Sequence, residues 1–147
     1  ARRASRCRPW HRQAIKREKI EELARPYRDR VKLHLSFLTD EEFEMAIQAV
    51  DAIVLPYRKT FNGASGPLGE GVAKGKMIIA ANHGSLGDIV EKNHLGYTFE
   101  SENIEALKKV LNMAIQRTNY TYDEKANAYK NKLSINEFKK QYCKLYF

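Results

Sequence analysis

Apolar positions along the chain occur in two kinds of pattern, one typical of strands and the other of helices. Two short continuous apolar runs, 52–55 and 76–81, are typical of parallel strands that are covered on both faces. Residues 31–37 read VKLHLSF, and this alternation of apolar and polar residues predicts another strand. A shorter strand is predicted over 97–99, after the turn at Leu95 and Gly96.

Between these strands, apolar residues recur at spacings of three and four, which predicts helices. Thr39 precedes one of them and Glu42 follows three residues later, so a capping box is expected. Further helices are predicted over residues 11–27, from Pro67 to a left-handed cap at Gly75, and over residues 85–92. Another is expected after a cap at Ser101. Most of the chain after Tyr122 is also predicted to be helical, with a new helix beginning at Ser134.

Four strands that alternate with helices predict an α/β fold, a Rossmann-like parallel sheet with flanking helices and right-handed crossovers. Ligands of such sheets bind beyond the carboxyl ends of the strands. Three predicted loops lie at those ends, over residues 37–40, 57–66 and 82–85. The expected organisation is a basic segment and helix over 1–30, a Rossmann-like core over 31–117, and C-terminal helices over 118–147.

Composition excludes several classes of protein. A hydrophobic fraction of 43% with a charged fraction of 30% is typical of an ordered globular domain, and no apolar run approaches the length of a membrane span. Cys7 and Cys143 have neither the spacing of a metal site nor that of a disulfide framework. We therefore expect a cytoplasmic protein that holds no metal and no cofactor.

The positive charge is concentrated at the start of the chain. Residues 1–30 hold 11 of the 26 basic residues and 4 of the 18 acidic ones, a net charge of +7, whereas the whole chain carries +8. This segment is either a solvated end or, with Trp10, a patch that binds an anionic membrane surface. Nucleic acid is not an expected partner, because the rest of the chain is nearly neutral.

The loop over 57–66 has the features of a phosphate site. It follows a buried strand, contains Gly63 and Gly66, and leads into a helix with Pro67 in the first turn. The backbone N–H groups at such a helix start point outward at the positive end of the helix dipole. The alternative is an ordinary strand-to-helix turn, which is common in α/β domains.

A longer series of signals surrounds this loop. A strand ends at Pro56, the loop contains Ser65-Gly66-Pro67-Leu68, and Glu70 lies on the following helix, ahead of Ala73-Lys74-Gly75-Lys76-Met77-Ile78-Ile79-Ala80. Gly84, Asp88 and Gly96 then follow in order. Over roughly residues 31–117, this order resembles the C-terminal donor-binding domain of the GT-B-fold retaining glycosyltransferases of family 4, also called group 1.

The resemblance implies a nucleoside-diphosphate sugar as donor, and it implies roles for particular residues. Glu70 matches the acidic residue that holds the ribose, since a carboxylate can accept both vicinal hydroxyls. The alternative for Glu70 is a solvated carboxylate on a helix surface. Arg58, with the neighbouring Lys59, could offset the charge of the diphosphate or form a solvated basic pair. The implied diphosphate-binding positions are Ser65, Gly66, Leu68 and Arg58.

Asn62 departs from the family pattern. It lies eight positions before Glu70, where the family usually carries a first glutamate near the transferred sugar, so Asn62 is the candidate catalytic position. An amide can bind hydroxyls but carries no charge. A whole enzyme also needs an N-terminal acceptor domain, for which 147 residues leave too little room. We expect the donor-binding portion of a retaining glycosyltransferase, inactive as an isolated fragment; the alternative is a non-enzymatic Rossmann-like nucleotide-binding or interaction module.

Overall fold

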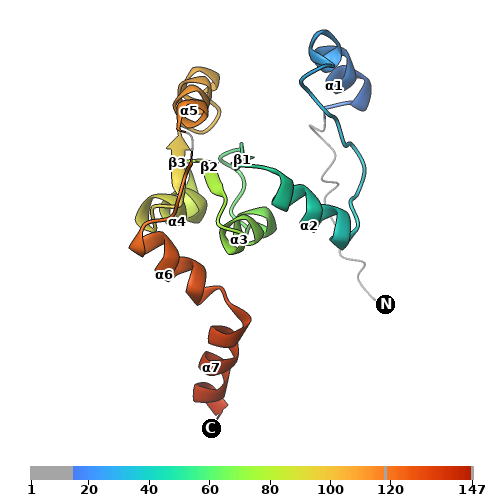
Figure 1. The fold of residues 1–147 in the computed structure, drawn as a ribbon. Coiled ribbons are helices and arrows are strands. Elements are labelled where there is room, and N and C mark those ends of the chain that lie inside the picture. Colours follow the sequence, from blue (N-terminus) through green and yellow to red (C-terminus); the bar gives the residue numbers. More distant parts are fainter. Residues whose placement is uncertain (1–14, 118, 147) are drawn as a thin grey trace, which may run out of the picture. The chain divides into compact units, whose positions relative to one another are not determined.

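The computed structural model describes residues 15–117 and 119–146, and Figure 1 labels their helices and strands. The chain divides into two compact units, the first ending at Leu38 and the second beginning at Thr39. The first 14 residues of the predicted basic segment, which include Cys7 and Trp10, lie outside the described residues. The first unit contains the helix α1 (Arg17–Ala24) and the 3-10 turn η1 (Arg25–Tyr27). The second contains α2 (Asp40–Ala49), β1 (Ala52–Leu55), α3 (Gly66–Ala73), β2 (Met77–Ala81), α4 (Gly84–Lys92), β3 (Gly96–Phe99), α5 (Ile104–Gln116), α6 (Glu124–Lys132) and α7 (Ile135–Tyr146).

The second unit is built on a parallel sheet of three strands in the order β1-β2-β3. Ala52 of β1 pairs with Met77 of β2, and Ile78 of β2 pairs with Gly96 of β3. A helix lies between each strand and the next along the chain, as right-handed crossovers require. The predicted α/β, Rossmann-like fold is confirmed, and so are the strands predicted over 52–55, 76–81 and 97–99, each to within one residue.

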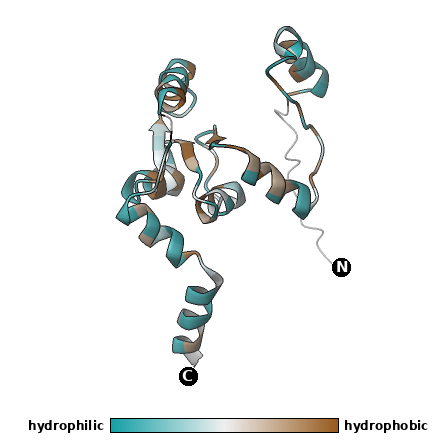
Figure 2. Ribbon diagram, viewed as in Figure 1, coloured by the Kyte–Doolittle hydropathy of each residue, from teal (hydrophilic) through white to brown (hydrophobic). Residues whose placement is uncertain are grey.

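Helices cover both faces of the sheet. The side chains of β2 alternate, so that Met77 and Ile79 pack against α5 while Ile78 and Ala80 pack with α3 and α4. Figure 1 shows α5 on one side of the strands and α3 and α4 on the other. Figure 2 colours β2 as hydrophobic and most of α6 as hydrophilic. The core therefore has two layers, and every residue of β2 is buried.

Two strand predictions are corrected by the structure. Residues 31–37 form no strand, and Val31, Leu33 and Leu35 are 41%, 42% and 37% exposed. An alternating sequence becomes a strand only when a neighbouring strand takes up its backbone hydrogen bonds, and the described sheet contains no such neighbour for these residues. The prediction that 52–55 is covered on both faces is also wrong, because β1 is an edge strand and Val54 is 39% exposed.

The predicted helix caps are confirmed more often than the predicted buried helix faces. The capping box is confirmed, with Thr39 Oγ1 accepting the Glu42 N–H at 3.2 Å and Glu42 Oε2 accepting the Thr39 N–H at 2.8 Å. Gly75 ends α3 with φ of +70°, as expected for a left-handed cap. Ser134 accepts the Glu137 N–H at 3.2 Å, which confirms the restart before α7.

Some predicted helix faces are wrong. The described part of the predicted helix over 11–27 is helical only in α1 and η1, and α1 has no buried residue, so its predicted inward face is not formed. On α5, the predicted apolar positions Ile104 and Ile115 are 78% and 76% exposed. The apolar stripe of α5 instead centres on its middle turns. Its residues against the sheet are Ala106, Leu107, Val110, Leu111 and Ala114.

Candidate functional site

Three loops meet at the carboxyl edge of the sheet, where parallel strands all end on the same side. They are residues 56–65 after β1, 82–83 after β2, and 100–103 after β3. Two of them overlap the loops predicted over 57–66 and 82–85, and they end one and two residues earlier than expected because α3 begins at Gly66 and α4 at Gly84. The third predicted loop, residues 37–40, does not follow a strand, because 31–37 is not one. The loop after β3 takes the place of that loop at this edge.

A tyrosine connects the loop after β1 to the start of α3. The Tyr57 hydroxyl lies 3.2 Å from Ser65 Oγ. Ser65 is the N-cap of α3, and its Oγ accepts the Leu68 N–H at 3.3 Å. The Tyr57 ring also packs on Phe61, with the ring centroids 4.1 Å apart. Side-chain contacts therefore fix this loop against the helix that it leads into.

The first turn of α3 is open at Gly66. A methyl group placed on Gly66 would meet no atom within 4 Å. The Gly66 N–H has no acceptor among the described residues, whereas the Leu68 N–H is already bonded to Ser65 and Pro67 has none. A ligand can thus approach the backbone closely at the positive end of the α3 dipole, with Gly66 as the available donor and Leu68 as a shared one.

The structure separates the predicted site residues into two groups. Glu70 is exposed on α3, one turn beyond Gly66 and on the same face of the helix. The Oδ1 atom of Asn62 lies 3.6 Å from the position that a methyl group on Gly84 would occupy, beside the start of α4. Arg58 instead lines a cavity of about 320 Å³ with the end of β3 and the first turn of α5. The α3 group and Arg58 therefore lie on different sides of the sheet edge.

Ser101, which the sequence did not assign to the site, holds the three loops together. Ser101 is 3% exposed, its N–H donates to Asn82 Oδ1 at 3.2 Å, and its hydroxyl donates to the Tyr57 carbonyl at 3.1 Å. The prediction that Ser101 caps α5 is wrong, because Asn103 does so by accepting the Ala106 N–H at 3.0 Å. Ser101 thereby joins residues that follow β1, β2 and β3.

Comparison with known proteins identifies the family of this chain. A family model for glycosyl transferases group 1 matches residues 11–117, which include the sheet and its whole carboxyl edge. The chain belongs to this family. The resemblance identified from the sequence is thereby confirmed. A search of curated proteins gave no match.

The group 1 glycosyltransferase domain packs against residues that lie beyond the matched region. Ala126 of α6 is fully buried in the layer formed by α3 and α4. Tyr122 donates its hydroxyl to the Lys76 carbonyl at 2.7 Å, and burial raises its pKa. These contacts make α6 part of the same core as the sheet.

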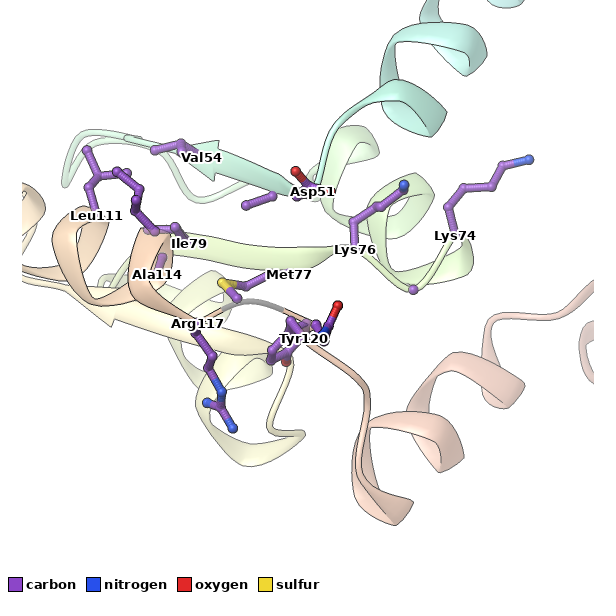
Figure 3. Close-up of a pocket in the computed structure, with 14 residues that line it drawn as sticks. Asp51, Val54, Lys74, Lys76, Met77, Ile79, Leu111, Ala114, Arg117 and Tyr120 are labelled. Carbon is purple, nitrogen blue, oxygen red and sulfur yellow. The ribbon is translucent and has the colours of Figure 1, made fainter.

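A cavity larger than the one beside Arg58 lies at the opposite edge of the glycosyltransferase domain, near the amino ends of β1 and β2. It has a volume of about 660 Å³, and Figure 3 shows Val54, Ile79 and Leu111 on its apolar side. Lys74 and Lys76 extend away from it in Figure 3, Lys74 toward Glu44 and Lys76 toward the Gln48 carbonyl. This cavity offers apolar contact but no helix start, so it lacks the outward backbone N–H groups that suit a phosphate.

A histidine and a carboxylate form a hydrogen-bonded pair at the amino edge of the glycosyltransferase domain. Asp123 Oδ1 accepts the Ala126 N–H at 2.8 Å, and Asp123 Oδ2 lies 2.7 Å from His94 Nδ1. The Ala126 N–H and His94 both hold the pKa of the Asp123 carboxyl below its usual value. His94 has a positive φ of 54°, so the pair secures a turn between α4 and β3 that few residues other than glycine adopt.

The described residues form neither a metal-binding group of side chains nor a membrane-spanning helix. No three His, Cys, Asp or Glu side chains in this part of the chain are grouped so that they could hold a metal ion. None of the described helices is long and apolar enough to cross a membrane.

Proposed function

We propose that this glycosyltransferase domain binds the donor substrate, a nucleoside-diphosphate sugar, at the carboxyl edge of the sheet. The observation that carries the proposal is the open first turn of α3, where Gly66 admits a ligand to the backbone one turn before the exposed Glu70. A diphosphate at Gly66 would be stabilised by the helix dipole and by the backbone N–H groups. A ribose one turn further along could place both hydroxyls on Glu70.

The proposed reaction is transfer of the sugar with retention of its anomeric configuration. The bond from the anomeric carbon to the diphosphate oxygen breaks, and the bonding electrons leave with the nucleoside diphosphate. A bond from an acceptor hydroxyl oxygen to the same carbon forms, and the hydroxyl proton is released. The start of α3 favours this step because it stabilises the negative charge that develops on the departing diphosphate. Asn62, beside Gly84, would bind sugar hydroxyls without contributing a charge.

Calorimetric titration of the chain with nucleoside diphosphates, diphospho-sugars and inorganic pyrophosphate tests this proposal. Glu70→Gln should weaken nucleoside diphosphate binding by about 10- to 150-fold, since a hydrogen bond to a charged group contributes about 1.5–3 kcal/mol. Pyrophosphate, which has no ribose, should bind the variant and the wild type alike. Glu124→Gln removes the same charge from the first turn of α6 and should leave every affinity unchanged.

The outcomes separate the two parts of the proposal. If the wild-type chain binds none of these ligands, the proposed donor site is wrong. If nucleoside diphosphates bind equally well to wild type and Glu70→Gln, the ribose does not lie on Glu70. The alternative is a nucleotide-binding module without enzymatic activity, and the specific observation that favours it is the amide of Asn62 in place of a carboxylate.

A further inference from the structure

We propose that Ser101 is a positioning residue for the donor site, which it orders through Tyr57. The inference rests on the proposed function for its effect on nucleotide binding, but the linkage itself is a property of the ligand-free protein. Ser101 is the one polar residue that is buried among the described residues, and both its N–H and its hydroxyl donate hydrogen bonds. Neither bond lies within a helix or a strand.

The Ser101 hydroxyl acts on the main chain of the loop after β1. It donates to the Tyr57 carbonyl at 3.1 Å, two residues past the end of β1. The opposite end of the same residue, the Tyr57 hydroxyl, lies 3.2 Å from Ser65 Oγ at the N-cap of α3. Tyr57 thus connects Ser101, which follows β3, to the start of α3. Its side chain has only two torsions, so it has little conformational freedom. Packing of the Tyr57 ring on Phe61 restricts it further.

The Ser101 backbone acts on the loop after β2. Its N–H donates to Asn82 Oδ1 at 3.2 Å, next to the point where the Asn82 N–H donates to the Phe99 carbonyl at 2.8 Å. Asn82 lies two residues before Gly84, and Asn62 Oδ1 lies 3.6 Å from where a Cβ on Gly84 would be. The two bonds of Ser101 therefore reach both sides of the proposed site, the start of α3 and the start of α4.

Capping α5 and pairing β2 with β3 are structural roles that Ser101 could have, but other residues perform both. Asn103 caps α5, and the ladder between β2 and β3 continues to the pair Ala81 and Phe99 without help from Ser101. Alanine at position 101 is smaller than serine, so it fits the same space and leaves the Tyr57 carbonyl without its donor. The expected effect of losing the hydroxyl is a looser loop over 57–66 within a sheet that stays paired.

The test compares Ser101→Ala, Ser101→Thr and Ser134→Ala by amide hydrogen exchange without ligand and by nucleoside diphosphate titration. Ser101→Ala should speed exchange across 57–66 relative to the amides of β2, and weaken nucleoside diphosphate binding about tenfold. Ser101→Thr keeps the hydroxyl and should restore both. Ser134→Ala removes a serine hydroxyl that accepts one N–H before α7, and should change neither.

A second variant keeps the test decisive if threonine does not fit at position 101. Tyr57→Phe retains the ring but removes the hydroxyl that faces Ser65, and should weaken nucleoside diphosphate binding in the same direction as Ser101→Ala. A Ser101→Ala protein with unchanged exchange over 57–66 and unchanged affinity overturns the inference, even if its melting temperature falls. If wild type binds no nucleoside diphosphate, the proposed function fails while the exchange rates still decide the linkage.

Discussion

A methyl group added at Gly96 should destabilise the sheet more than an addition at any exposed helix position. Gly96 opens β3 with φ of +151°, a backbone conformation that side chains rarely adopt, and it pairs with Ile78 in the middle of the sheet. A Cβ there would lie 2.1 Å from the Ile78 oxygen and 2.8 Å from the Ile78 nitrogen. These are backbone atoms, so they cannot move aside as the end of a flexible side chain can.

The size of the effect follows from two costs. Holding a residue other than glycine in such a conformation costs about 1–3 kcal/mol. Forcing extra volume into a packed interior costs about 1–3 kcal/mol more. Together these give about 2–6 kcal/mol for Gly96→Ala, a large share of the roughly 5–15 kcal/mol that stabilises a typical domain. The variant should therefore fold marginally or not at all.

Gly69→Ala is the matched comparison. Gly69 lies inside α3, where a methyl group would meet no atom within 4 Å, so alanine should raise the free energy of unfolding by about 0.5–1 kcal/mol. Urea denaturation of wild type and both variants, followed by far-ultraviolet circular dichroism, measures the differences from the transition midpoints. A Gly96→Ala loss below about 1 kcal/mol would refute the close approach of β3 to β2 on which the calculation depends.

Three further predictions concern binding, pH and transfer. Gly66→Val should weaken pyrophosphate and nucleoside diphosphate binding together, because its side chain fills the open approach to the helix start, and calorimetry on both ligands checks this. The pKa of Asp123 is lower in the folded chain than in the unfolded one, so its stabilisation is present above about pH 3.9 and is lost as the pH falls further. Asp123→Asn should therefore flatten the fall in melting temperature below about pH 4, and an unchanged slope would contradict the assignment. We expect the chain by itself to bind a sugar nucleotide without transferring the sugar, because transfer needs an acceptor held against the donor, and product analysis against a blank without protein tests this.

Periodicity predicted the elements that bury most of their surface. The apolar run of β2 needs no context, since helices cover it on both faces, and its prediction is correct. The alternation in 31–37 is as typical of a strand as the apolar run of β2. A strand also needs a neighbouring strand to pair with, and the sequence of the segment does not specify one. Ser101 and Asn103 are equally good caps by residue type, and only the tertiary bond from Ser101 to Tyr57 distinguishes them.

The candidate site was predictable as a location but not as a geometry. The glycines and Pro67 identified the start of α3, because those residue types are suited to a helix start that a ligand can approach. Arg58 was grouped with that start because it is close in sequence. Counting alternate residues along β1 would have placed Pro56 and Arg58 on the face of Val54, which is the side of α5 where the structure has them.

The strand order also has a consequence for how the chain can fold during its own synthesis. Each strand pairs with the next one made, and each connecting helix is available before the strand that follows it, so every step closes only a short loop. Structure can therefore grow in one direction from β1, with Gly96 settling on Ile78 as soon as β3 emerges from the ribosome. The exception is α6, which is made after the whole sheet and adds Ala126 to the core cluster that contains Val72 and Val90. Until α6 is made, a nascent chain that has already formed the carboxyl edge of its sheet leaves the apolar surface of α3 and α4 exposed, and chaperones can bind it.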